Sequence, residues 1–240
     1  MPVEPWALVV AVVVTMVASS IQGIIGIGFA LISIPTLSLV DPALTPVPQL
    51  LVTAPMTMWM AWQERRHIDL SGVGWIMAGR VAGAVIGLTL LKVSTDAAID
   101  VLMASAVLVA VAILGLGIKV AQNRVTKAAA GTLSGTMALV ASMAGPPLAL
   151  LYKDERGPVI RATLATIFTM GVAITLVTRI VGGEITTDDV KIGAMIFPGL
   201  VAGLAIARVS RYRFEGAAIR VGILVLSTIG AIGLILRAVS

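Results

Sequence analysis

Two kinds of residue in this chain could do chemistry: glycines and prolines that interrupt apolar segments, and an arginine inside one. The first break lies at Gly23–Gly28 in QGIIGIGFALISIP, and the second at Gly145–Pro147 in SMAGPPLALLY. In lipid, a broken helix is tolerated only where its freed backbone groups are buried in protein or line a cavity. Helix N-termini present unpaired N–H groups and a partial positive charge. Two such ends, converging from opposite faces of a membrane, predict an anion site.

Arg80 is the arginine inside an apolar segment, at a depth of roughly 12 Å along its predicted helix. A charge at that depth is costly in a membrane and usually has a function. We expect Arg80 to attract or hold the anion. Snorkelling toward Arg65 and Arg66 at the membrane surface is the alternative, which the sequence leaves open.

Neutral polar side chains near the breaks and on segment 45–63 complete the predicted site. They would add hydrogen bonds to the anion, although some of them could instead bond neighbouring helices. The predicted substrate-binding residues are Gln22, Gly23, Gly26, Gly28, Ser33, Gln49, Thr53, Arg80, Ser142, Gly145, Pro146 and Pro147.

The composition indicates that a membrane must surround these residues. Of 240 residues, 58% are hydrophobic and only 12% charged, and the mean hydropathy is +1.05. Soluble domains carry about 45–50% apolar and about 25% charged residues. A soluble enzyme, a disordered chain and a nucleic-acid-binding domain are therefore excluded, despite the net charge of +5. Membrane lipid is the expected surrounding. The first six residues, MPVEPW, lack the positive charge with which a cleaved signal peptide begins, so we expect no such peptide.

Eight apolar stretches with short connections predict one all-α bundle in the plasma membrane. A transmembrane helix needs about 20 mostly apolar residues. The stretch at 6–40 is too long for one crossing and carries glycine and proline breaks, so a hairpin is favoured, with a single crossing left open. The stretches lie at 6–40, 45–63, 72–91, 97–118, 128–152, 160–181, 189–207 and 218–238.

The positions of Lys and Arg test how these stretches cross the membrane. If all eight simply cross, the two sides carry equal numbers of positive charges, which is unusual because cytoplasmic loops collect them. If segment 128–152 enters and returns on one side, twelve Lys and Arg residues lie on the cytoplasmic side and four lie outside. Both chain termini are then predicted to lie outside. The cytoplasmic set is then Arg65, Arg66, Lys119, Arg124, Lys127, Lys153, Arg156, Arg161, Arg208, Arg211, Arg213 and Arg220.

The two halves of the chain resemble each other. Residues 79–101 and 199–221 lie 120 positions apart and are identical at nine of 23 aligned positions, including Gly79/Gly199 and Gly83/Gly203. Internal duplication is typical of secondary transporters. We expect residues 1–120 and 121–240 to form an inverted repeat, each half a broken or re-entrant helical hairpin followed by three transmembrane helices.

The ionisable residues argue against an enzyme and against a carboxylate proton relay. There is no Cys, a single His in a connection, and every Asp and Glu lies in or beside a connection. A membrane hydrolase or acyltransferase would need a nucleophile with a positioned base, or clustered metal ligands. We therefore predict no catalytic residue, no metal and no cofactor.

Four segments together resemble the TauE/SafE sulfite exporter family of membrane permeases, over essentially the whole chain. They are GIIGIGFALISIP, WQERRHIDLSGVGWIMAGRVAGAVIG, RATLATIF at 161–168 and PGLVAGLAIARVSRYRFEGAAIRVGILVLSTIGAIGLIL. In the second hairpin, Ala-Gly-Pro-Pro stands where the family has a Gly-Gly-rich stretch. The resemblance implies a duplicated fold and export of sulfite, sulfonates or related small oxyanions.

The expected function is thus secondary transport of a small organic or inorganic anion by alternating access, with the anion near the midplane at half-helix N-termini. Two alternatives stay open on the residues alone: a passive anion channel, which could use the same helix ends, and a drug/metabolite-type transporter of another small solute. The sequence leaves homo-oligomer formation open and predicts no nucleic-acid partner.

Overall fold

A computed structural model describes the chain, apart from isolated positions elsewhere, over residues 3–95, 121–152, 155 and 157–210. These parts are helical and contain no strand. Apart from those isolated positions, the apolar segments expected at 97–118 and 218–238 lie outside the described residues, as do the partners at 217–221 of the repeat matches.

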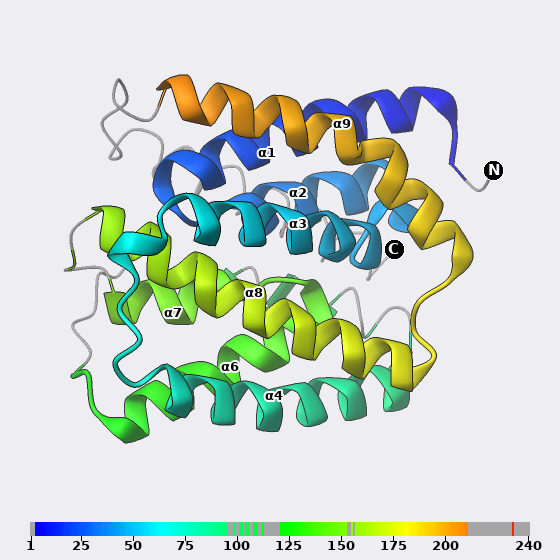
Figure 1. Cartoon of the computed structure of the whole chain (residues 1–240). Helices are drawn as coiled ribbons and strands as arrows, with labels where there is room; N and C mark the ends of the chain where they lie inside the picture. The colour runs from blue at the N-terminus through cyan, green and yellow to red at the C-terminus, as the bar shows by residue number, and fades with distance from the viewer. Residues whose placement is uncertain are drawn as a thin grey trace.

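The described helices lie alongside one another in a bundle (Figure 1). Four of them, α1, α4, α8 and α9, are long and apolar enough to cross a membrane. In chain order the elements are α1 (Pro5–Ile25), α2 (Phe29–Val40), η1 (Pro42–Leu44), α3 (Val47–Gln63), η2 (Arg65–His67), α4 (Val73–Val93), α6 (Arg124–Ala141), α7 (Gly145–Tyr152), α8 (Gly157–Gly182) and α9 (Thr187–Ser210).

The first break forms where the sequence predicts it. Helix α1 is closed by Gly26, whose φ of +97° is left-handed and therefore suits glycine, and whose N–H donates to the Gln22 carbonyl. Helix α2 starts at Phe29, after Gly28. It packs against α1 and runs back beside it, so segment 6–40 is a hairpin rather than one continuous helix (Figure 1).

The second break separates α6 from α7. Ser142 closes α6 with a left-handed φ of +52°, and α7 begins at Gly145. Pro146 and Pro147 lie in the first turn of α7, where their missing N–H groups remove no helical hydrogen bond. The Gln122 side chain donates to the Leu151 carbonyl at 2.6 Å. The start of α6 and the end of α7 therefore lie at the same end of the bundle, as the charge count favours.

The two arms of each hairpin differ in length. Helices α1 and α6 have 21 and 18 residues, whereas α2 has 12 and α7 only eight. The long arms persist because each packs along another helix, α1 on α9 and α6 on α4. The short arms α2 and α7 are about 18 Å and 12 Å long. Together they match the roughly 30 Å of a bilayer's hydrocarbon core.

Glycines bring α4 against α6 and α9 against α1 in equivalent ways. A Cβ on Gly79 would lie 2.1 Å from the Ala128 carbonyl oxygen, and one on Gly199 would lie 2.3 Å from that of Val12. Such close backbone approach is what small residues permit in membrane helices. The two contacted carbonyls are 116 residues apart. The left-handed caps Gly26 and Ser142 are also 116 residues apart. The same spacing separates Phe29 and Gly145, the first residues of α2 and α7.

Basic residues gather at one end of the bundle. Six of them lie in η2 directly after α3, at the end of α9, or near the start of α6 or of α8. These parts of the chain share one side of the bundle (Figure 1). The six are Arg65, Arg66, Arg124, Lys127, Arg161 and Arg208. We refer to this side as the basic end. Of the other predicted cytoplasmic charges, those at 119, 153, 156, 211, 213 and 220 lie outside the described residues.

The close glycine contacts give a stability prediction. Gly83→Ala would place a methyl group 2.1 Å from the Thr132 carbonyl oxygen and should force α4 away from α6. We expect a loss of roughly 1–3 kcal/mol, as for other overpacked contacts, measured by thermal unfolding in detergent. Gly74→Ala in the same helix is the control, because nothing lies within 4 Å of that site. Equal melting temperatures for the two variants would contradict this packing.

The second hairpin gives a topology prediction. Because the chain has no Cys, single cysteines can be placed at the exposed positions Arg124 and Glu155, and at Lys92 and Lys191. A membrane-impermeant maleimide should label the first two from one side of the membrane and the last two from the other. Labelling of positions 124 and 155 from opposite sides would mean that the segment between them crosses the membrane.

Candidate anion-binding site

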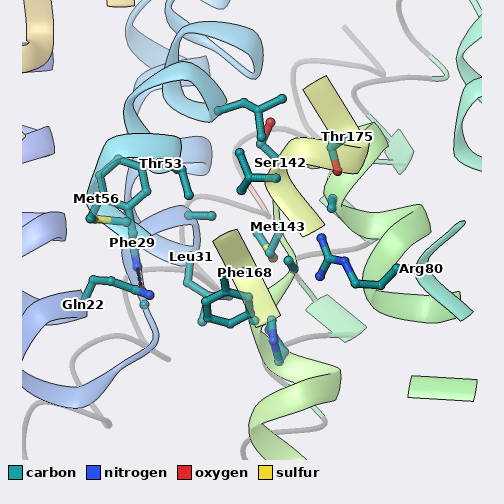
Figure 2. A pocket seen from close by; sticks show the side chains of 18 residues that line it. Gln22, Phe29, Leu31, Thr53, Met56, Arg80, Ser142, Met143, Phe168 and Thr175 are labelled. Carbon is teal, nitrogen blue, oxygen red and sulfur yellow. Dashed lines mark hydrogen bonds between the residues drawn. The ribbon is translucent and has the colours of Figure 1, made fainter. Parts of the chain in front are cut away.

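An open cavity lies where the two hairpins meet the remaining helices. Its empty volume is about 520 Å³. Figure 2 shows Arg80 on one side of this cavity and Gln22 and Phe29 on the other, with Ser142, Met143 and Thr175 also lining it. The lining comes from α1, α2, α3, α4, α6, α7 and α8 and from the loops at both breaks, so the site depends on the whole bundle.

Arg80 reaches this cavity as a buried guanidinium. Its side chain is only 1% exposed. Nη1 donates to Ser134 Oγ at 2.8 Å, and that hydroxyl donates to the Ala144 carbonyl at 2.7 Å. The other two nitrogens, Nε and Nη2, have no hydrogen-bond partner among the described residues. Arg80 is thus held through Nη1, and the opposite edge of its guanidinium, formed by Nε and Nη2, is buried without a hydrogen-bond partner among these residues.

A glycine on α8 makes room for this guanidinium. A Cβ on Gly171 would lie 2.1 Å from the Arg80 Cζ and Nε atoms. No side chain other than hydrogen therefore fits at this position while Arg80 keeps its place. Gly171 is accordingly a part of the site that the sequence analysis missed, because nothing in the sequence pairs it with Arg80.

The described residues that line the cavity carry no negative charge to balance Arg80. None of the residues that line it is Asp or Glu. The edge formed by Nε and Nη2 presents two parallel N–H directions, which match two oxygen atoms of one oxyanion. A buried, unpaired cation is costly, and an anion on this edge would remove that cost.

The tips of the two hairpins meet beside the cavity. A Cβ on Gly145 would lie 3.7 Å from the Ile27 side chain, in ordinary contact. Within the first tip, Gln22 Nε2 donates to the Gly26 carbonyl at 2.9 Å, and Phe29 N–H donates to Gln22 Oε1 at 3.0 Å. Gln22 therefore braces the tip of its own hairpin.

The N-termini of α2 and α7 offer fewer N–H donors than the sequence analysis expected. At α7, Pro146 and Pro147 have no N–H to give. At α2, the Phe29 N–H is taken by Gln22. The helix ends carry a positive dipole, and the charged donors without a partner in the described lining of this cavity are Nε and Nη2 of Arg80.

The hydroxyl groups that line the cavity have their protons committed elsewhere. Thr53 donates to the Gln49 carbonyl at 2.8 Å, Ser142 to that of Pro46 at 3.0 Å, and Thr175 to that of Gly171 at 3.0 Å. Such bonds to nearby carbonyls are common for Ser and Thr in helices. These side chains make the cavity lining polar, but their hydroxyl protons are already donated to backbone carbonyls.

The cavity brings together seven of the twelve predicted site residues. Arg80 lies between α6 and α8 rather than snorkelling toward the basic end. The seven are Gln22, Gly28, Thr53, Arg80, Ser142, Gly145 and Pro146.

The other five predicted residues do not line the cavity. Gly23 packs against Ala207 of α9, and Gly26 packs against Arg161. Ser33 and Gln49 are buried, with Gln49 Nε2 within 3.5 Å of the Leu44 carbonyl. Pro147 is buried in the first turn of α7.

Apolar and cationic residues that sequence reasoning missed complete the surroundings. Phe29, Leu31, Met56 and Phe168 cover much of the cavity wall, and no sequence signal separates them from other apolar residues of a membrane helix. Arg179 on α8 is 2% exposed and its Nη2 donates to the Leu139 carbonyl near the end of α6. Its burial places it in the bundle, but it does not line the cavity.

The described residues contain no group of three or more His, Cys, Asp or Glu side chains that could hold a metal ion. The charged group that the described lining offers is the guanidinium of Arg80, in a cavity with a largely apolar wall.

Long apolar helices packed around this cavity define a multi-pass membrane protein. A family model described as "Sulfite exporter TauE/SafE" matches residues 11–234. The chain therefore belongs to the TauE/SafE family, whose members are membrane transporters and not enzymes. No curated protein and no solved structure matches the chain.

The bracing of the first hairpin can be tested at Gln22. Gln22→Met keeps the size of the side chain but leaves the Phe29 N–H and the Gly26 carbonyl without this partner. We expect a loss of about 1–3 kcal/mol for each buried group left unpaired, measured by thermal unfolding. Gln122→Met is the matched control, because Gln122 is exposed and water can replace its bond to Leu151. Equal destabilisation by the two changes would contradict the bracing role.

Proposed function

We propose that this protein is a secondary transporter that exports sulfite, organosulfonates or related small oxyanions across the plasma membrane by alternating access. The observation that carries the proposal is the free Nε–Nη2 edge of Arg80, buried in a cavity whose described lining holds no carboxylate. The membership of the chain in a sulfite exporter family supports the same chemistry.

The anion would lie with two oxygens on the Arg80 edge. The N-termini of α2 and α7 would add favourable dipoles from the side of the hairpin tips. The apolar wall at Phe29, Leu31 and Phe168 would contact the organic group of a sulfonate. Sulfite has no such group, so sulfonates gain additional buried apolar area in this cavity.

Alternating access would use two halves related by an inverted repeat. The constant spacing of 116 residues between the caps, the starts of the short helices and the glycine-contacted carbonyls supports this relation. In the first half α4 packs on α6 of the second, and in the second half α9 packs on α1 of the first. Two equivalent, mutually exchanged contacts suit rocking of one half against the other around a shared site.

The basic end would face the cytoplasm, because positive residues concentrate on the cytoplasmic side of membrane proteins. The N-terminus of α1 lies at the opposite end of the bundle and would be outside (Figure 1). With an inverted repeat of four elements in each half, the C-terminus would return to the outside as well.

The role of Arg80 predicts a loss of transport in two different variants. Arg80→Gln removes the charge, and Gly171→Ala keeps the charge but occupies the space of the guanidinium. Both should weaken binding of an alkylsulfonate by at least roughly tenfold, as expected for loss of a charged hydrogen-bond partner. Binding is measured by calorimetry on purified protein, and transport by counterflow in proteoliposomes.

Arg124→Gln is the matched control, because Arg124 is an exposed arginine outside the cavity. Its binding and counterflow should equal those of the wild type. Wild-type counterflow in proteoliposomes containing Arg80→Gln would contradict the proposal. Saturating exchange by the wild type supports a carrier, whereas conductance without exchange would indicate the channel instead.

A further inference from the structure

The donors available in the cavity limit how much negative charge a bound anion can carry. Arg80 is the only charged residue in the described lining. Its Nη1 is engaged with Ser134, which leaves Nε and Nη2 for a ligand. The two free positions accept two oxygen atoms and balance one negative charge.

The neutral groups of the described lining supply no second positive charge. Thr53, Ser142 and Thr175 donate their protons to backbone carbonyls. The first-turn prolines of α7 have no N–H, and the Phe29 N–H of α2 is bonded to Gln22. A dianion would therefore leave a second charge unpaired among the apolar side chains, where an unpaired charge is strongly disfavoured.

We propose that the cavity selects singly charged oxyanions and discriminates against dianions of the same shape. This inference rests on the proposed anion site at Arg80 and adds the charge state of its ligand. A sulfonate is a monoanion at all physiological pH values. Sulfite loses its last proton near neutral pH, so hydrogensulfite would be the bound species.

The protein itself should contribute no pH dependence near neutrality. Helices α1, α2 and α3 contain no ionisable side chain. The ionisable residues on the other helices around the cavity are, besides Arg80, Lys92 of α4, Arg124 and Lys127 of α6, Tyr152 of α7, and Arg161 and Arg179 of α8. None of these lines the cavity. The pH dependence of sulfite binding should therefore follow the ionisation of sulfite.

The first test compares sulfate with methyl sulfate, which share four oxygens on sulfur but carry two charges and one. Calorimetry on the purified wild-type protein should show methyl sulfate binding at least roughly tenfold more tightly, because the second charge has no partner. Equal or tighter binding of sulfate would overturn the inference. Binding of neither ion would overturn the inference and the proposed function together.

The second test compares sulfite with methanesulfonate about one pH unit on either side of neutrality. The apparent Kd for sulfite should rise with pH in proportion to the loss of hydrogensulfite, approaching tenfold per unit. The Kd for methanesulfonate should stay constant. A constant Kd for sulfite would overturn the charge selection while leaving the anion site in place, and so would a methanesulfonate Kd that changes with pH. The Arg80→Gln variant should bind sulfate, methyl sulfate, sulfite and methanesulfonate weakly. That result would show that both tests measure binding at the Arg80 site.

Discussion

A guanidinium buried without a counter-charge is the constraint on which the cavity depends. Arg80 is held away from water between α6 and α8, and the described lining offers it one hydroxyl partner and no carboxylate. The cost of burying a charge is tolerated only where something repays it. An oxyanion on the free Nε–Nη2 edge would do so. Binding of the anion would then stabilise the arrangement of the helices that place this edge in the cavity.

The bundle positions Arg80 through backbone contact rather than through large side chains. Gly79 and Gly83 let α4 approach the backbone of α6, and this approach brings Arg80 to Ser134. Gly171 leaves the space that the guanidinium fills. The two hairpin tips then line the cavity. The tip of the first hairpin is braced by its own Gln22, whereas that of the second is tied to α4 through the bonds from Arg80 to Ser134 and from Ser134 to Ala144.

The sequence predicted the parts of this arrangement that depend on local chemistry. A glycine cluster in an apolar segment has few outcomes in lipid, so the break near Gly26 could be predicted, and so could the buried charge of Arg80. The lengths of the half-helices could not, because α1 and α6 are extended by packing against α9 and α4. The donors could not be counted either, because the protons of Thr53 and Ser142 are committed by contacts that only the folded backbone defines.

The anion site at Arg80 is tested most directly by a crystal structure of the protein with methanesulfonate bound. The account predicts two sulfonate oxygens within hydrogen-bonding distance of Arg80 Nε and Nη2, with the methyl group toward Phe29 and Phe168. It would be contradicted by sulfonate density away from Arg80, or by an Arg80 side chain that extends to the basic end and leaves the cavity without a charge.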